Sequence, residues 1–295
     1  MPFLVLVLLA LAGGALTAYL ASRYPTPVIG QEPAAAASEK LAEETAKRPW
    51  LRRTLARRVD PQTATGLVLT LALGLAIVGG LLVGILAFLM RSSATLVSVD
   101  NSAGEWGVVH ATPWSTQAIQ RVTDLGGTWF VIAFGVVVCV VEYVRVPNRW
   151  IPVFLLTVIV GEVVLVNSIK ELLHRVRPTF NPIAETLGPS FPSGHSATAA
   201  AFYGAVALVM ARRRSPRVRA LLAGAAVAVA LGVAASRVLL GVHWLSDVAA
   251  GLAFGWGWFA LCAIAFGGRF LNFGKPAEKA TRVAERVEAG SAPTR

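Results

Sequence analysis

The stretch IPVFLLTVIVGEVVLVNSIKELLHRVRP, residues 151–178, combines the two features that decide how this chain folds. Its first part, 151–169, is an apolar run of 19 residues, close to the roughly 20 that an α-helix needs to cross the hydrocarbon core of a bilayer. The run ends in a dense group of cationic side chains that begins at Lys170 and closes with Arg177. The stretch therefore predicts a transmembrane helix with positive charge concentrated at one end.

The composition extends this interpretation to the whole chain. Of the 295 residues, 55% are hydrophobic and only 15% are charged, whereas a soluble domain usually carries about 25% charged residues. The mean hydropathy is +0.63. These values exclude a disordered, collagen-like or ordinary cytosolic protein. Cys139 and Cys262 both lie in apolar runs, so the sequence contains neither a disulfide framework nor a paired-cysteine metal motif.

Six further apolar runs are long enough, or nearly so, to cross a membrane: 3–21, 67–90, 129–144, 197–211, 220–235 and 248–266. Two of them, 197–211 and 220–235, are short and rich in Ala, which predicts inner helices that pack closely against their neighbours. No alternating strand pattern is present. The sequence predicts an all-α, polytopic membrane helix bundle.

The distribution of charge predicts the orientation of this bundle. If residues 23–66, 145–150, 212–219 and 269–295 are cytoplasmic, 21 of the 27 Lys and Arg lie on that side and six on the other. Such an excess is typical of the cytoplasmic loops of membrane proteins. It explains the net charge of +11 without nucleic acid, because the basic clusters serve as topology determinants and as contacts for anionic lipid.

These spans divide the chain into four predicted segments. They are an N-terminal transmembrane helix (1–22), a basic cytoplasmic linker (23–66), a six-helix core (67–268) and a cytoplasmic tail (269–295). Residues 1–22 could also be a cleaved signal. However, no positive charge precedes their apolar part, and cleavage would leave the eight Lys and Arg of the linker outside. A retained helix is therefore the favoured interpretation.

Three polar segments fall on the same side of the membrane, opposite the basic loops. They are Lys170-x6-Arg177-Pro178, Pro192-Ser193-Gly194-His195 and Ser236-Arg237-x5-His243-x3-Asp247. Their common side was not used to choose the orientation, so it supports that orientation independently. Charged groups at membrane depth are costly and usually functional, which makes these segments the candidate site.

The residue types in these segments suit the chemistry of phosphate. Three fixed cations are supplied by Lys170, Arg177 and Arg237. An arginine can bind a phosphate with two parallel hydrogen bonds. The segment around Ser193 and Gly194 leads into a helix, whose N-terminal N–H groups and positive dipole attract an anion. Together these groups predict an anion cradle that is built without a metal ion.

Two histidines complete the predicted site. His243 and Asp247 are four residues apart, so the carboxylate of Asp247 can bind one imidazole nitrogen and leave the other free to attack phosphorus. His195 reaches the site from a different helix and is suited to protonate the departing oxygen. It could then activate the water that frees the enzyme.

These three segments resemble the three-part signature of the type 2 phosphatidic acid phosphatase (PAP2) family, with every signature position present and in order. The resemblance covers 67–268 in architecture and 170–247 in motif. It implies a six-helix integral core, here with an extra N-terminal helix, and a metal-independent phosphatase without cofactors. It also implies a site on the extracytoplasmic face of a bacterial inner membrane.

The resemblance also implies a role for each signature residue. His243 would be the nucleophile, Asp247 its partner and His195 the leaving-group acid. The phosphate would be held by Lys170, Arg177, Ser193, Gly194 and Arg237. The implied substrates are lipid phosphates, such as undecaprenyl pyrophosphate, phosphatidylglycerol phosphate or phosphatidate. The preferred lipid and the oligomeric state stay open.

Two other functions compete with hydrolysis. A phosphotransferase would pass the same phosphohistidine to a sugar or lipid hydroxyl instead of to water. A non-enzymatic lipid-binding or transport protein would bind a phosphate lipid without releasing phosphate, and would keep this property without His243. The complete set of nucleophile, acid and orienting carboxylate argues against the non-enzymatic class.

Several nearby residues receive a structural interpretation. We expect His174 to be an interfacial helix residue and Glu162, in the middle of a span, to make a hydrogen bond between helices. Arg175 is as well suited to the outer positive field as to a structural role. The segment 91–127 is expected to be an external loop with an amphipathic helix at 114–125, and its acids, Asp100 among them, show no metal spacing.

Overall fold

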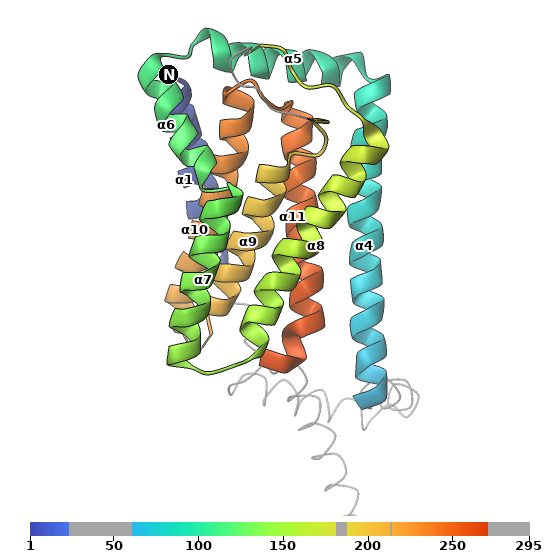
Figure 1. Cartoon of the computed structure of the whole chain (residues 1–295), viewed down its shortest axis with the longest axis vertical. Helices are drawn as coiled ribbons and strands as arrows, with labels where there is room; N and C mark the ends of the chain where they lie inside the picture. The colour runs from blue at the N-terminus through green and yellow to red at the C-terminus, as the bar shows by residue number, and fades with distance from the viewer. Residues whose placement is uncertain (24–60, 181–187, 213, 271–295) are drawn as a thin grey trace, which may run out of the picture. The chain divides into compact units, whose positions relative to one another are not determined.

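The computed structural model describes residues 1–23, 61–180, 188–212 and 214–270, and its secondary structure over these ranges is entirely helical (Figure 1). The helices are α1 (Pro2–Arg23), α4 (Pro61–Ser92), α5 (Ala94–Val109), α6 (Pro113–Asp124), α7 (Thr128–Arg145), α8 (Trp150–Leu173), α9 (Gly194–Met210), α10 (Pro216–Leu239) and α11 (Leu245–Phe270). The predicted all-α membrane bundle is confirmed. Most of the linker at 23–66 and of the tail at 269–295 lies outside the described residues, so the four-segment division stays a prediction.

The chain consists of two compact units. The first contains Met1–Tyr24 and Leu75–Ala263, and thus α1, α5 to α10 and most of α4 and α11. The second contains Pro25–Gly74 and Ile264–Arg295, of which only the first turns of α4 and the last residues of α11 are described. Every contact discussed below lies within the first unit.

Every apolar run predicted from the sequence is a helix in the structure. Within the described residues, α1, α7, α8, α10 and α11 are long and apolar enough to span a membrane, and α4 together with α5 passes as a bent pair. At 17 residues, α9 is shorter than a standard span. Ten of its 17 residues are nevertheless buried, as expected for a central helix of the bundle.

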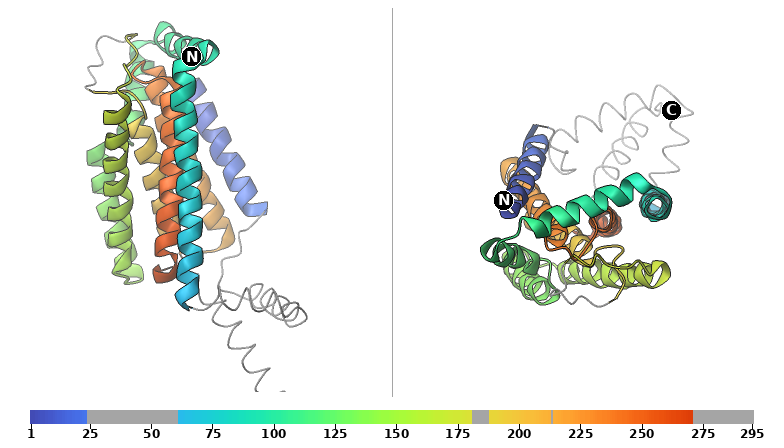
Figure 2. Two further views of the ribbon diagram at one scale, coloured as in Figure 1. Left: turned by 90° about the vertical axis from the view of Figure 1, so that its right-hand side faces the viewer. Right: turned by 90° about the horizontal axis from the view of Figure 1, so that it is seen from above.

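Within the predicted external loop at 91–127, the helix expected at 114–125 is confirmed as α6, whereas 94–109 forms a second helix, α5, that was not predicted. The chain bends by 91° between α4 and α5, so that α5 crosses one end of the bundle (Figures 1 and 2). Each helix has its own N-cap: the side chain of Ser93 accepts from Leu96 N, and Thr112 forms a capping box with Ser115. Ser93 and Thr112 are therefore helix-starting residues in a segment whose polar residues suggested a loop.

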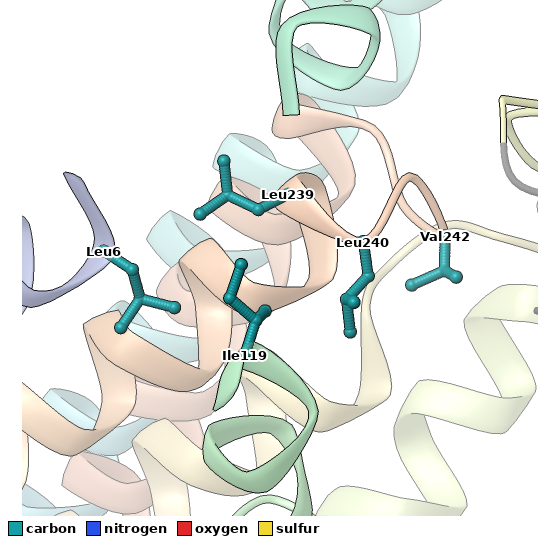
Figure 3. Packing of buried hydrophobic residues seen from close by; sticks show 5 residues of the cluster. All are labelled: Leu6, Ile119, Leu239, Leu240 and Val242. Carbon is teal, nitrogen blue, oxygen red and sulfur yellow. The ribbon is translucent and has the colours of Figure 1, made fainter. Parts of the chain in front are cut away.

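A small apolar cluster joins α1, α6 and the end of α10 (Figure 3). It contains Leu6 from α1, Ile119 from α6, and Leu239, Leu240 and Val242 from the end of α10 and the turn after it, all at least 92% buried. Because Val242 directly precedes His243, this packing holds the backbone of the candidate site against two other helices.

The N-terminal helix packs closely against α10. An ideal Cβ placed on Gly14 would lie 2.7 Å from the carbonyl oxygen of Gly224, and one placed on Gly224 would lie 2.6 Å from that of Gly14. Only glycine permits so close an approach of two helix backbones. The helix α1 is therefore an integral part of this unit rather than a peripheral attachment.

Candidate active site

The three signature segments meet at the end of the bundle that α5 crosses (Figure 1). At this end α8 finishes with Lys170 in its last turn, α9 begins at Gly194, α10 finishes shortly after Arg237, and α11 begins at Leu245. Four helix ends and the segments next to them therefore supply all eight site residues that were predicted from the sequence. None of the eight is left elsewhere in the fold.

His243 and Asp247 form the pair that their spacing predicts. His243 Nδ1 lies 3.3 Å from Asp247 Oδ2, and both side chains are almost completely buried. Asp247 is the third residue of α11, and its Oδ2 also accepts from the backbone N–H of Trp244, 3.1 Å away, as the carboxylate of a capping box does. The start of the helix thus fixes the carboxylate before it meets the imidazole.

The other nitrogen of His243 faces Arg177. Arg177 Nη1 lies 3.0 Å from His243 Nε2, so Nε2 is the acceptor and Nδ1 carries the proton towards Asp247. The same guanidinium donates to the carbonyl oxygens of Gly188, Pro189 and Val242. Burial lowers the pKa of the Arg177 guanidinium somewhat, with Asp247 opposing that shift.

The remaining cations surround the two histidines. Lys170 lies within electrostatic range of Arg177, Asp247 and Arg237, and its ammonium lies beside Gly194. Arg237 is 93% buried, and its Nε has no hydrogen-bond partner among the described residues. An unpartnered guanidinium N–H inside a protein is costly, so it marks a position where an anionic ligand would be stabilised.

The segment 193–195 completes the cradle at the start of α9. The backbone N–H of Ser193 donates to the carbonyl oxygen of Asp247, 3.0 Å away, which joins the starts of α9 and α11. Ser193 Oγ accepts from Ser196 and does not cap the helix.

His195 lies within electrostatic range of Arg237, His243, Lys170 and Arg177. A phosphate between these groups would meet a helix N-terminus, three cations and two imidazoles.

Burial sets the basicity of the candidate nucleophile. The pKa of His243 is lowered to about 4, with burial as the largest cause; the hydrogen bond and charge of Asp247 oppose this shift, and the charges of Arg177 and Arg237 add to it. His243 is therefore neutral near pH 7, with a lone pair on Nε2. Neutral imidazole is the form that can act as a nucleophile.

Two of the residues near the site behave as expected. Glu162 is buried in the middle of α8 and accepts a hydrogen bond from Thr198 of α9 at 2.9 Å, which confirms the predicted contact between helices. His174 is exposed at the end of α8, where it adopts a left-handed backbone conformation (φ 48°) and pairs loosely with Glu171.

Two further residues belong to the site although the sequence did not assign them to it. Arg175 donates to Asp247 Oδ1 and, at 2.8 Å, to Asp100 Oδ2, so it lies between two carboxylates rather than in an open positive field. Asp100 is 99% buried on α5, within the segment that was expected to be a surface loop. A buried acid opposite an arginine that lies far away in sequence has no local sequence signal.

Comparison with known proteins agrees with this geometry. The family model of the PAP2 superfamily matches residues 151–270, which includes all three signature segments. The chain is 30% identical to phosphatidylglycerophosphatase B of Bacillus subtilis over 176 residues, covering 58% of this chain and 84% of that protein. It is 40% identical to the lipid A 1-phosphatase of Rhizobium etli over 122 residues, but covers only 48% of that relative.

The fold agrees as well. The crystal structure of a transmembrane PAP2-type phosphatidylglycerolphosphate phosphatase from Bacillus subtilis superposes with a TM-score of 0.58 at 28% sequence identity, covering 63% of this chain and 92% of that one. The fold and the site thus define a multi-pass membrane phosphatase of the kind that acts on lipid phosphates. The chain belongs to the PAP2 superfamily.

Proposed function

We propose that this protein hydrolyses a phosphomonoester or pyrophosphate of a membrane lipid through a phosphohistidine at His243, without a metal ion. The observation that carries the proposal is the position of His243, whose Nδ1 faces Asp247 while its Nε2 faces the cation Arg177. A nucleophile held in this way has one tautomer and one direction of attack.

In the first step, His243 Nε2 attacks phosphorus and forms an N–P bond. The bond from phosphorus to the lipid oxygen breaks, and its electrons stay on that oxygen. Burial and the neighbouring cations lower the pKa of His195 to about 3 in the free site, and the bound phosphate anion would raise it again, so that His195 holds the proton that it donates to the leaving alcohol or phosphate. The proton on Nδ1 stays between His243 and Asp247, whose negative charge stabilises the phosphoimidazolium as it forms. In the second step, His195 accepts a proton from water as that water attacks phosphorus, and the N–P bond breaks.

The cations supply the electrostatic part of the catalysis. The transferred phosphoryl group carries its charge on three equatorial oxygens, and Lys170, Arg177, Arg237 and the start of α9 surround the position that it would occupy. Arg237 Nε would gain a partner, and Arg177 would move its hydrogen bond from His243 Nε2 to a phosphate oxygen. Both changes occur only when phosphate is bound.

The lipid substrate would be taken from the outer leaflet. The excess of Lys and Arg in the segments 23–66, 145–150, 212–219 and 269–295 supports a site on the extracytoplasmic side. Substrates of this class include phosphatidylglycerol phosphate, phosphatidate and undecaprenyl pyrophosphate, all of which present a terminal phosphate at the headgroup level. The relatives named as phosphatidylglycerophosphatase and lipid A 1-phosphatase support a phosphate on a lipid.

The test is phosphate release from these three lipids by the purified full-length protein in detergent and EDTA. His243→Ala should abolish release, whereas His110→Ala, which alters an exposed histidine stacked on Trp106, should leave it unchanged. Rapid quenching into alkali with 32P-labelled lipid should trap an acid-labile phosphoenzyme in the wild type and none in His243→Ala. Release that persists in His243→Ala would contradict the proposal, and transfer of the label to an added alcohol without free phosphate would indicate a phosphotransferase.

A further inference from the structure

Asp100, Arg175 and Asp247 form a continuous chain of charges behind the nucleophile. Arg175 Nη2 lies 2.8 Å from Asp100 Oδ2, and Arg175 Nη1 donates to Asp247 Oδ1. The other carboxylate oxygen of Asp247 faces His243 Nδ1. The two carboxylates are at most 2% exposed and the guanidinium is 17% exposed. These three residues are called the acid–arginine–acid chain below.

Ser246 connects the acid–arginine–acid chain to the start of α11 by hydrogen bonds. Asp100 Oδ1 accepts from the backbone N–H of Ser246 at 2.9 Å, and Asp100 Oδ2 accepts from its hydroxyl, which also accepts from Arg175 Nη1 at 2.8 Å. Ser246 is the second residue of α11 and Asp247 the third, so Asp100 satisfies an N–H group that a helix N-terminus would otherwise leave free. One helix, α5, thereby fixes the turn from which Asp247 reaches His243.

The charges of the chain explain why two acids are needed. Arg175 alone beside Asp247 would neutralise the carboxylate and weaken its attraction for a positively charged imidazole. Asp100 offsets the charge of Arg175, so that the acid–arginine–acid chain keeps a net charge of −1. The net charge beside His243 is therefore the same as it would be with Asp247 alone, but the carboxylate of Asp247 is now held in one orientation.

We propose that Asp100 and Arg175 are positioning residues for the phosphorylation of His243, acting through Asp247. This inference rests on the proposed function and assigns a role in it to α5, which lies outside the part of the chain that the family model matches. Neither residue touches the position of the phosphate. Their removal should lower the rate of the chemical step and leave the binding of the phosphoryl group almost unchanged.

The test compares Asp100→Asn with Glu142→Gln in the full-length protein. Glu142 is a second buried acid paired with an arginine, Arg145 at 3.2 Å, but it lies at the other end of the bundle. Outer partners that orient a functional imidazole change activity by about 10- to 100-fold, so we expect a loss of kcat of that size in Asp100→Asn, with KM and the inhibitory concentration of inorganic phosphate within about threefold of wild type. Glu142→Gln should retain kcat.

Two more variants separate positioning from folding. Ser246→Ala removes the hydroxyl that joins Asp100 to Arg175 but keeps the backbone hydrogen bond to Asp100, so it should fold and lower kcat by a few-fold. If Asp100 acts through Arg175, Asp100→Asn combined with Arg175→Met should lose no more kcat than Arg175→Met alone. A wild-type kcat in Asp100→Asn, or a loss confined to KM, would overturn the inference.

The proposed function fails in a different way. It fails when the wild type releases no phosphate from any of the three lipids, or when His243→Ala is as active as the wild type. A wild type that is active, a His243→Ala that is inactive and an Asp100→Asn with full kcat would leave the proposed function standing and reject the positioning role.

Discussion

Arg177 donates to the Nε2 of His243 across 3.0 Å, so the group expected to hold the substrate also covers the nitrogen expected to attack it. The guanidinium is fixed in this position by three backbone carbonyls, those of Gly188, Pro189 and Val242. In the free enzyme it satisfies the lone pair of His243. Phosphate oxygens would compete for the same N–H, which links substrate binding directly to exposure of the nucleophile.

This relationship predicts a large effect of Arg177→Lys. The planar guanidinium of Arg177 can donate to His243, to three carbonyls and to a phosphate, whereas a lysine ammonium cannot reach all of these acceptors. The variant should therefore lose about 10²- to 10³-fold in kcat/KM, which is the cost of removing one donor to a transition-state oxyanion. The same substitution at Arg121, an exposed residue of α6, should have no effect. Phosphate-release kinetics on both variants provide the measurement, and equal rates would disprove the role of Arg177.

The pH dependence follows from the burial of His243. Its neutral form attacks phosphorus, and its pKa is lowered to about 4, so the acid limb of kcat/KM that reports His243 should lie near pH 4. Because Asp247 raises this pKa, Asp247→Asn should shift the acid limb to still lower pH while reducing the maximum rate. The profile is read after correction for ionisation of the substrate phosphate, followed by 31P NMR. An acid limb near the ordinary histidine value of about 6.5 would contradict this assignment.

Inhibition by vanadate should test the contribution of the cation cradle to the transition state. Trigonal bipyramidal vanadate resembles the phosphoryl transition state, so it should inhibit at micromolar concentrations and in the presence of EDTA. Arg237→Ala should weaken this inhibition by about tenfold or more, because Arg237 Nε has no other partner. Strict dependence of activity on added Mg²⁺, or indifference to vanadate, would refute a metal-independent phosphohistidine mechanism.

The contact between α1 and α10 predicts a stability effect remote from the site. At Gly14 an added methyl group would overlap the backbone of α10, so Gly14→Ala should lower the free energy of unfolding by about 1–3 kcal/mol, as overpacking does. Gly84→Ala on α4 is the matched control, because nothing lies within 4 Å of its added methyl group. Thermal unfolding in detergent should show a lower Tm for Gly14→Ala only; equal values would mean that α1 is not held by this contact.

Much of the fold could be predicted because each membrane-spanning helix has a local sequence signal, a long apolar run. The run at 151–169 became α8, Trp150–Leu173, and the run at 129–144 became α7, Thr128–Arg145, since every backbone group in a bilayer must find its partner within the helix. Within the segment 91–127, the helix at 114–125 was predicted correctly and is α6, but the part that forms α5 was predicted wrongly as a loop. Ser, Asp, Asn and Gly interrupt the apolar residues of α5, so its sequence lacks the long apolar run of a spanning helix.

The sequence by itself determined the class of protein and the eight candidate site residues, because apolar length and the spacing of His243 and Asp247 are local properties. The tertiary structure alone decided the partners of these residues. That Arg175 joins Asp247 to Asp100, and that Arg177 covers Nε2 of His243, depends on how α5, α8 and α11 approach one another. Such contacts are set by side-chain packing between helices that are distant in sequence, and no spacing along the chain encodes them.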